Sequence, residues 1–372
     1  MLFTISTNTL QKQLQLVNGA VGAGAVMPIL SDFLFELDGS TLSIIASDME
    51  LTMHTDVEVM GTEDGAIAIP AKMLTEVIKN LPEQPLTFVV DEETGAIIIR
   101  SQNGEYKIAG ENAAEFPEMT TLSGAQTITL NSDLLLAAAT KTLFATGTDQ
   151  LRPAMTGIFC KFDENGAVFV ATDAHKLVKL EHTAQTYTEN VSFILPRKAL
   201  TLLKNALPAN TIVHLTYNAS NALFTFESIK LNCLLVEGRF PDYSVVIPTK
   251  NHNIITVDRN ELLNATKRAV IFSNKSTFEV VFTLSENTLK LNTQDLDFAT
   301  ESHENIACDY QGEELEIAFN ARFLIEMLSA IETDEVRIEL SVPFKAGLVL
   351  PATQETDEHL LMLIMPIMRH RQ

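Results

Sequence analysis

The sequence predicts an α+β protein made of three tandem repeats, each with two helices packed on antiparallel sheet. Three observations support this fold class: a helix–strand block that occurs three times, a further helix at the start of each unit, and alternating segments bounded by turn residues. The length of 372 residues also favours several domains, because a chain of this size exceeds one ordinary hydrophobic core.

The first observation is a block with helical apolar spacing, then a polar break, then strand-like alternation. Its three copies are PAKMLTEVIKNLPEQPLTFVV, PRKALTLLKNALPANTIVHLTY and NARFLIEMLSAIETDEVRIELS. Leu74, Leu200 and Leu324 occupy the same place in each copy, at separations of 126 and 124 residues. Such a long period indicates repeated domains rather than a short solenoid repeat.

The second observation is a helix that follows a short β-type run in each unit. The runs are FTIS, TITL and IITV, and the expected helix caps are Thr7, Asn131 and Asp258. The unit ends also recur, because EFPEM and RFPDY place Phe-Pro pairs 124 residues apart, and Asp48 precedes Asp173 by 125 residues.

The third observation is strand alternation with hairpin turns at Asp38-Gly39 and Asn165-Gly166. Each unit is expected to hold two helices and about eight strands. The predicted domains are therefore residues 1–124, 125–248 and 249–372.

Composition predicts a cytoplasmic protein without a membrane span. The longest apolar stretch near the end, Leu360–Met368, has nine residues, whereas a spanning helix needs roughly twenty. The N-terminus MLFTISTNTL has no secretory pattern. Cys160, Cys233 and Cys308 have no CxxC spacing, and their odd number argues against a disulfide framework.

The net charge of −22 is unevenly distributed. In the six predicted helical windows together, Lys and Arg exceed Asp and Glu by seven, which leaves −29 for the rest of the chain. The windows are Asn8–Val26, Ala71–Leu81, Asn131–Arg152, Pro196–Asn205, Asp258–Ser276 and Asn320–Ala330. We expect a mildly basic helical surface and strongly acidic sheets, with chance variation in helix composition as the alternative.

The segment ATDAHKLVKL places a hydroxyl, an acid and an imidazole, Thr172, Asp173 and His175, within four positions. A hydrolase also needs a nucleophile held against its base and an oxyanion hole, and the sequence has no GxSxG or HExxH motif. The matching Asp48 is followed by Met-Glu without a histidine. We therefore interpret Asp173 as a cap at a strand end and His175 as a surface residue, and predict no catalytic residue.

No cofactor or metal site is predicted. The glycines of GAVGAG are in the wrong order for a GxGxxG loop and follow a helix, and no histidine pair has metal-ligand spacing. The C-terminus LLMLIMPIMRHRQ is expected to be a strand that leaves its sheet at Pro366. Met365, Ile367 and Met368 are then expected to be apolar surface residues suited to binding.

The repeats together with MPILSDFLF, TDAHKL, EGRFPDY, FNARF and the closing MPIM resemble the bacterial sliding clamps, the beta subunits of DNA polymerase III, over the full chain. This resemblance implies a non-catalytic processivity factor for DNA replication. It also implies a head-to-tail homodimeric ring whose helices line a hole for duplex DNA, held through backbone contacts that read no sequence. The implied partners are double-stranded DNA, the replicative polymerase, the clamp loader and repair proteins, without a membrane.

The resemblance further implies a pocket that receives short peptides from these partner proteins. Carried over by position, its wall comprises Arg152, Met155, Thr172, Ala174, His175, Lys176, Leu177, Pro241, Val246, Leu363, Ile364, Met365, Pro366 and Ile367. At two places the chain departs from the family pattern in ways that are expected to change which peptides the pocket prefers. Val245 replaces a rim arginine, and the tail continues through residues 368–372.

The implied DNA contacts are Arg197 and Lys198, then Lys72, Lys79, Lys267 and Lys275. Gly24 and Pro153-Ala154 depart from the pattern there, because Gly24 occupies a place that can hold arginine and Pro153-Ala154 replaces an aromatic pair. The implied ring joint sets Tyr106 and Ile108 against Ile271 and Phe272. Two other readings stay open at this point: a repeated scaffold that binds peptides but not DNA, and a hydrolase that depends on His175.

Overall fold

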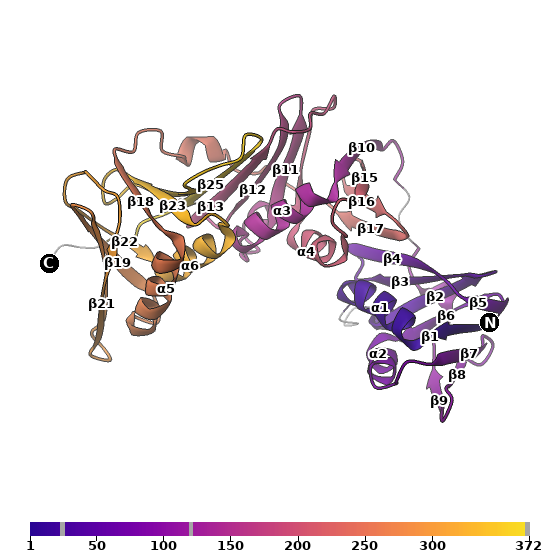
Figure 1. Cartoon of the computed structure of the whole chain (residues 1–372). Helices are drawn as coiled ribbons and strands as arrows, with labels where there is room; N and C mark the ends of the chain where they lie inside the picture. Colours follow the sequence, from indigo (N-terminus) through magenta and orange to yellow (C-terminus); the bar gives the residue numbers. More distant parts are fainter. Residues whose placement is uncertain (23–26, 119–121, 369–372) are drawn as a thin grey trace. The chain divides into compact units, whose positions relative to one another are not determined.

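The computed structural model describes residues 1–22, 27–118 and 122–368 (Figure 1). The chain forms two compact units. Unit 1 is Met1–Leu136 with Lys198–Leu235, and unit 2 is Ala137–Arg197 with Val236–Gln372. Gly24 and the tail residues 369–372 lie outside the described residues.

The helices occur in pairs, two in each predicted repeat. They are α1 (Thr7–Val17), α2 (Ala71–Lys79), α3 (Ser132–Thr142), α4 (Arg197–Ala206), α5 (Arg259–Ala269) and α6 (Ala321–Ala330). Two of the three expected caps are confirmed, since Asn131 Oδ1 accepts the amide of Asp133 at 2.8 Å and Asp258 Oδ1 accepts that of Glu261 at 2.7 Å.

The third cap prediction is wrong by one residue. Ser6 Oγ accepts the amide of Thr9 at 3.2 Å, whereas Thr7 is the first helical residue and is buried. Thr7 donates its hydroxyl to the carbonyl of Gln84 at 3.0 Å, so its side chain ties the helix to the neighbouring strand and does not cap it.

Unit 1 contains two antiparallel sheets with continuous backbone pairing. The five-stranded sheet has the order β5-β1-β7-β8-β9, and the eight-stranded sheet the order β10-β15-β16-β17-β4-β3-β2-β6. The first comprises β1 (Leu2–Ser6), β5 (Met60–Glu63), β7 (Pro85–Asp91), β8 (Ala96–Arg100) and β9 (Glu105–Ala109). The second comprises β2 (Asp32–Asp38), β3 (Thr41–Ser47), β4 (Leu51–Glu58), β6 (Gly65–Pro70), β10 (Gln126–Asn131), β15 (Ile212–Tyr217), β16 (Asn221–Phe226) and β17 (Ile229–Leu234).

Unit 2 has an eight-stranded sheet with the order β14-β11-β12-β13-β25-β24-β23-β18 and a four-stranded sheet with the order β21-β20-β19-β22. The first comprises β11 (Gly157–Asp163), β12 (Gly166–Thr172), β13 (Lys176–His182), β14 (Val191–Pro196), β18 (Asn253–Asp258), β23 (Glu335–Leu340), β24 (Gly347–Pro351) and β25 (Glu358–Ile364). The second comprises β19 (Glu279–Ser285), β20 (Thr288–Asp295), β21 (Thr300–Ala307) and β22 (Leu315–Asn320).

The two eight-stranded sheets join strands of successive predicted repeats. In the sheet of unit 1, β4 pairs with β17, and in that of unit 2, β13 pairs with β25. We call these pairings junction 1 and junction 2. Within the described residues, the three predicted repeats contain nine, eight and eight strands, close to the expected eight.

Both predicted hairpin turns are present. Gly39 lies between β2 and β3 with φ of 58°, and Gly166 opens β12 with φ of 119°. These backbone angles lie in the region that glycine adopts without a steric penalty.

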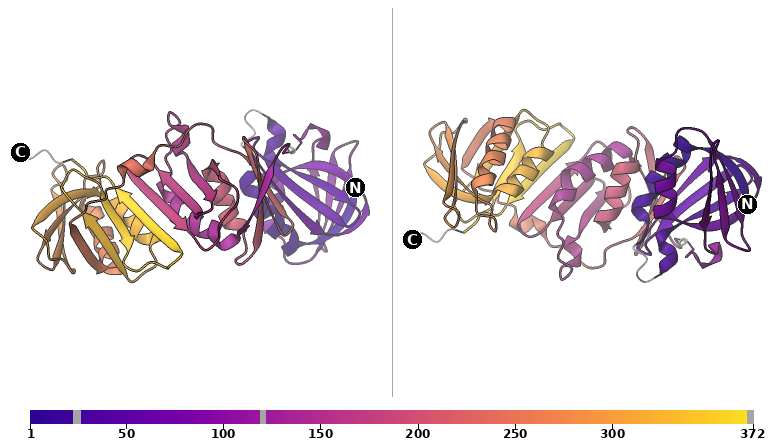
Figure 2. Two further views of the ribbon diagram at one scale, coloured as in Figure 1. Left: turned by 90° about the horizontal axis from the view of Figure 1, so that it is seen from above. Right: turned by 90° about the horizontal axis from the view of Figure 1, so that it is seen from below.

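The helices cover one side of their sheets and keep an exposed outer face. In unit 1, α1 contacts α2 and lies on β1, β3 and β4 (Figure 1). Leu10, Leu14 and Leu74 are buried there, whereas Lys12 and Lys72 are exposed. In unit 2, α5 contacts α6, and the view from below in Figure 2 shows both in front of the strands. No helix in the described parts of the chain is long and apolar enough to cross a membrane.

Asp32, the first residue of β2, is a buried carboxylate in unit 1. It is 4% exposed, and its Oδ2 has no hydrogen-bond partner among the described residues. Ser31 donates its hydroxyl to Oδ1 at 3.4 Å. Burial, with a contribution from the charge of Glu111, raises the pKa of Asp32 to about 6. The ionised form therefore destabilises the folded chain at neutral pH.

We predict that Asp32→Asn stabilises the protein at pH 7.5 by about 1–2 kcal/mol. Because the pKa in the folded state lies above the unfolded value of 3.8, the wild type loses stability as pH rises through about 6, and the asparagine variant does not. Urea unfolding between pH 5 and 8 measures the free energy of unfolding of both proteins. The same pH dependence in both proteins would contradict the prediction.

Candidate functional site

The TDAHKL segment is a tight turn between β12 and β13. Thr172 Oγ1 donates to the carbonyl of Lys176 at 2.8 Å and accepts the amide of Ala174 at 3.1 Å. Asp173 Oδ1 accepts the amides of His175 and Lys176, each at 2.9 Å. Ala174 has φ of 75°, which the chain adopts to reverse direction. The prediction that Asp173 caps a strand end is confirmed.

The same turn occurs in the first repeat without a histidine. Ser47 Oγ accepts the amide of Met49 at 3.3 Å, and Asp48 Oδ1 accepts the amides of Glu50 and Leu51 at 3.1 and 2.8 Å. Met49 has φ of 80°, close to that of Ala174. The hydroxyl–acid pair thus serves backbone geometry in both repeats, which argues against a catalytic dyad.

Lys176 anchors the turn to α6. Its side chain is 5% exposed, and its Nζ lies 2.7 Å from Glu326 Oε2 and 3.4 Å from Asp173 Oδ2. The same ammonium lies 4.2 Å from the centre of the Phe323 ring. The predicted wall residue Lys176 is therefore directed at the helix, whereas His175 is exposed with its ring 6.3 Å from that of Phe323.

An apolar cluster lies beneath the turn, and we call it the junction-2 cluster. Its buried members come from β12, β13, β14, β24, β25, the residue before β24 and the RFPDY segment. They are Val170, Leu177, Ile194, Phe240, Ala346, Leu348 and Leu363. Leu177 and Leu363 were predicted from the sequence, and the other five members were not. Alternation within the predicted strands marks these residues as buried but does not show which strands meet.

Unit 2 also carries exposed apolar side chains. They include Val245, Val246, Val342, Phe344, Met365 and Met368. Val342 and Phe344, together with Phe323, were not among the predicted residues.

The C-terminal segment leaves its sheet as predicted, with Met365 and Met368 exposed, whereas Ile367 is half-buried. β25 ends at Ile364, and the chain leaves the sheet before Pro366. The amide of Met365 donates to the carbonyl of His175 at 2.9 Å, and that of Ile367 donates to the carbonyl of Ala318 at 2.8 Å. The first bond holds the end of the chain beside the turn, and the second ties Ile367 to β22.

The predicted wall residues differ in exposure. Arg152, Ala174, His175, Val246 and Met365 are exposed, and Met155, Pro241, Pro366 and Ile367 are half-buried. Thr172, Lys176, Leu177, Leu363 and Ile364 are buried. The five buried residues set the backbone path and lie beneath the predicted pocket. Only the exposed and half-buried residues offer side-chain surface to a ligand. Arg152 also pairs with Asp149 at 3.0 Å.

The predicted excess of positive charge on the helices is reduced by ion pairs with residues outside them. Lys198 Nζ lies 2.5 Å from Asp48 Oδ2, and Arg268 forms two hydrogen bonds with Glu304 at 2.7 and 2.8 Å. Lys141 is buried and pairs with Glu358. The count by helical windows missed these carboxylates because they are distant in sequence.

The remaining predicted DNA contacts are exposed. Arg197 opens α4, and Lys267 lies in the last turn of α5. Lys72 and Lys79 on α2 line one hollow of about 530 Å³, so unit 1 brings these two lysines together. Lys275 donates to the carbonyl of Ile271 at 2.6 Å.

The predicted ring-joint residues lie at free sheet edges and in a short helical turn. Tyr106 and Ile108 are on β9, an edge strand, but Ile108 is only 4% exposed and packs inward. Ile271 and Phe272 are 65% and 39% exposed. Leu296 and Phe298, at the hairpin that leads to edge strand β21, are also exposed and were not predicted.

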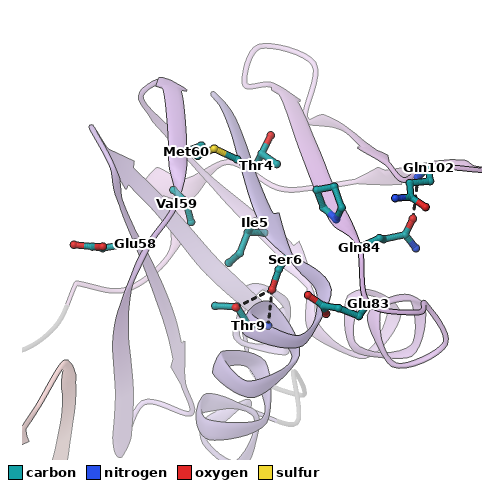
Figure 3. A pocket seen from close by; sticks show the side chains of 11 residues that line it. Thr4, Ile5, Ser6, Thr9, Glu58, Val59, Met60, Glu83, Gln84 and Gln102 are labelled. Atoms are coloured by element: carbon teal, nitrogen blue, oxygen red, sulfur yellow. Dashed lines mark hydrogen bonds between the residues drawn. The ribbon is translucent and has the colours of Figure 1, made fainter.

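A cavity of about 630 Å³ lies apart from all these residues, at the start of α1 in unit 1 (Figure 3). Its polar lining includes Glu58, Glu83, Gln84 and Gln102. Glu83 accepts the amide of Asn8 at 2.7 Å, and Gln84 accepts that of Gln102 at 2.9 Å. No predicted site residue lines it, and these bonds serve the helix start and a strand turn.

We predict that Asp173→Ala lowers the free energy of unfolding by about 1–3 kcal/mol, because two amides and Lys176 lose their acceptor. His175→Ala, at an exposed position in the same turn, is expected to change it by less than about 0.5 kcal/mol. Urea unfolding of both variants measures the difference. Equal effects would show that the turn does not depend on the Asp173 carboxylate.

Comparison with known proteins gives consistent results over the whole chain. It matches the family models of the DNA polymerase III beta subunit: the N-terminal domain over residues 1–120, the central domain over 129–242 and the C-terminal domain over 244–367. It is 29% identical to the beta sliding clamp of Synechococcus elongatus over 90% of this chain and 91% of that protein. It is 28% identical to that of Vibrio cholerae over 99% and 100%.

Solved structures of sliding clamps superpose on this chain over nearly its full length. The DNA polymerase III subunit beta of Pseudomonas aeruginosa, a sliding clamp bound to griselimycin, superposes with a TM-score of 0.93 at 27% identity, covering 99% of this chain and 100% of that one. The griselimycin-bound clamp of Bartonella birtlesii gives 0.92 at 26% identity, with the same coverage.

Proposed function

The chain belongs to the DNA polymerase III beta subunit family, the beta sliding clamps, and from this premise we propose how its own residues perform the processivity function. The protein is a non-catalytic accessory subunit of the replicative polymerase. We propose domain boundaries at residues 1–124, 125–248 and 249–372, with a cytoplasmic location. The observation that carries the function is the match of all three successive domains to the family along one chain.

We propose that two copies close into a ring around duplex DNA. The edge strands β9 and β21 offer unpaired backbone groups, which favour pairing with another chain. Ile271, Phe272, Leu296 and Phe298 supply exposed apolar area for that contact. Tyr106 contributes side-chain surface on β9, and Ile108 supports the strand from the core.

The exposed lysines and arginine of the helices are proposed to face the phosphates. They are Lys72, Lys79, Arg197, Lys267 and Lys275, with Lys198 shared with Asp48. Contacts of this kind position DNA without reading bases. Because Asp48, Glu304 and Glu358 neutralise part of the helical charge, attraction is weak and the ring can diffuse along the duplex.

The peptide-binding surface is proposed to lie at junction 2, over the junction-2 cluster. Ala174, His175, Val246 and Met365 present exposed walls, and the buried leucines form the floor. Polymerase, clamp loader and repair proteins would dock there through short apolar segments. Griselimycin, the ligand of the Pseudomonas and Bartonella relatives, is proposed to bind at the same place.

We predict that the loaded protein remains on nicked circular DNA in 0.5 M salt and is released after linearisation. Topological linkage does not depend on the phosphate contacts that salt weakens. Gel filtration of labelled protein with DNA measures retention. The double variant Ile271→Asp with Phe272→Asp places charge in the ring joint. It is expected to be released from both the circular and the linear DNA. Release of the unmodified protein from both forms alike contradicts the ring.

We predict that His175→Ala combined with Met365→Ala weakens griselimycin binding by about tenfold or more, because apolar contact area is lost from the walls. Isothermal titration calorimetry gives the affinity. The matched control is Glu50→Ala with Leu234→Ala at the corresponding positions of junction 1, which is expected to leave binding unchanged. An unaltered affinity of the first variant shows that the surface lies elsewhere.

A further inference from the structure

Each junction brings the hydroxyl–acid turn of one repeat against the second helix of the next repeat. At junction 2, Lys176 at the end of the turn donates from Nζ to Glu326 Oε2 of α6 at 2.7 Å. The two turns have the same hydrogen bonds, and α4 and α6 align at a separation of 124 residues, so matching positions can be compared. Junction 1 has Leu51 in place of Lys176 and Leu202 in place of Glu326.

The two matching positions of junction 1 are filled by apolar packing. Leu51 and Leu202 are both buried. Leu202 lies against Gly19, because a side chain at that glycine would meet its Cδ2 at 2.3 Å. Asp48 still accepts the two amides of its turn there. The turn therefore forms without an ammonium at the position of Lys176.

Junction 2 has an ionic and aromatic arrangement at the same place. The Lys176 ammonium is buried between the carboxylates of Glu326 and Asp173, at 2.7 and 3.4 Å. It also lies 4.2 Å from the centre of the Phe323 ring and 5.9 Å from that of Phe144. Burying such an ion pair carries a desolvation cost, and well-packed apolar residues in its place are often as stable or more stable. The costly arrangement at one junction, beside an apolar one at the other, indicates a role beyond folding.

The ammonium connects two aromatic rings that come from different repeats. Lys176 follows His175 directly in the chain, and its ammonium lies over the ring of Phe323 on α6. The rings of His175 and Phe323 are stacked, with centres 6.3 Å apart and 28° between their planes. His175 is exposed and Phe323 is half-buried. The matching residues of junction 1, Glu50 and Ala199, have no rings, so the ammonium and the ring pair occur together.

We propose that Lys176 and Glu326 are a positioning pair for the peptide-binding surface of junction 2, an inference that rests on the proposed function. The pair holds the rings of His175 and Phe323 in one orientation. They then form an aromatic wall next to Met365, whose amide donates to the His175 carbonyl at 2.9 Å. A ligand that meets an ordered wall does not lose affinity to the ordering of side chains. The ammonium acts through the rings and does not contact the ligand.

The test uses the full chain with Lys176→Leu and Glu326→Leu, which copies Leu51 and Leu202 of junction 1. Calorimetric titration with griselimycin is expected to give about tenfold weaker binding than the unmodified chain. The urea midpoint of this variant is expected to equal or exceed that of the unmodified chain. A purely structural pair would not lower the affinity of a fully folded protein. Lys176→Arg, whose guanidinium also binds carboxylates and stacks on rings, is expected to keep the affinity within about twofold.

The control is Arg268→Gln with Glu304→Gln, which removes another ion pair of unit 2 and is expected to leave the affinity unchanged. Unchanged affinity or a lowered urea midpoint of the leucine variant overturns the proposal. An equal loss of affinity in the control or in the arginine variant overturns it as well. His175→Ala with Met365→Ala separates the two levels of inference. If that variant keeps its affinity, the proposed surface is wrong. If it loses affinity while the leucine variant does not, only the positioning pair is wrong.

Discussion

The backbone hydrogen bonds that join strands of successive repeats are the constraint on which the rest of the structure depends. β13 would be an open sheet edge if β25 did not pair with it, and β4 likewise needs β17. The register sets Leu177 opposite Leu363 and Lys176 opposite Ile364. A slip of one residue would turn each side chain to the other face and disperse the junction-2 cluster. The same pairing delivers the C-terminal segment to the TDAHKL turn.

The charges of this chain are not simply divided between basic helices and acidic sheets. The helical cations nearest the sheets are neutralised by carboxylates that the fold brings to them: Lys198 by Asp48, and Arg268 by Glu304. Lys72 and Lys79 of α2 stay exposed on its outer face. A few exposed cations among many acids are consistent with the weak, salt-sensitive attraction to DNA that we propose.

The two junctions combine one backbone pattern with different side chains. Both have the hydroxyl–acid turn, the same strand pairing and an apolar cluster at the matching place. At junction 2 the opposed residues Leu177, Leu363 and Leu348 all belong to the apolar cluster. At junction 1 the matching residues are Thr52, Asn232 and Leu223, so the corresponding positions are partly polar.

The sequence by itself determined the fold class, the three repeats, the helix pairs, the hairpin at Gly39, and the exit of the chain from its sheet at Pro366. Each follows from local chemistry: periodicity, capping side chains, the backbone freedom of glycine and the missing amide of proline. Tertiary structure alone decided what depends on contacts between distant residues. It buried Lys176 against Glu326, paired Lys198 with Asp48, moved the first cap from Thr7 to Ser6 and turned Ile108 inward. Strand partners separated by more than 150 residues leave no periodic signal in the sequence, because pairing is set by the shape of the whole sheet.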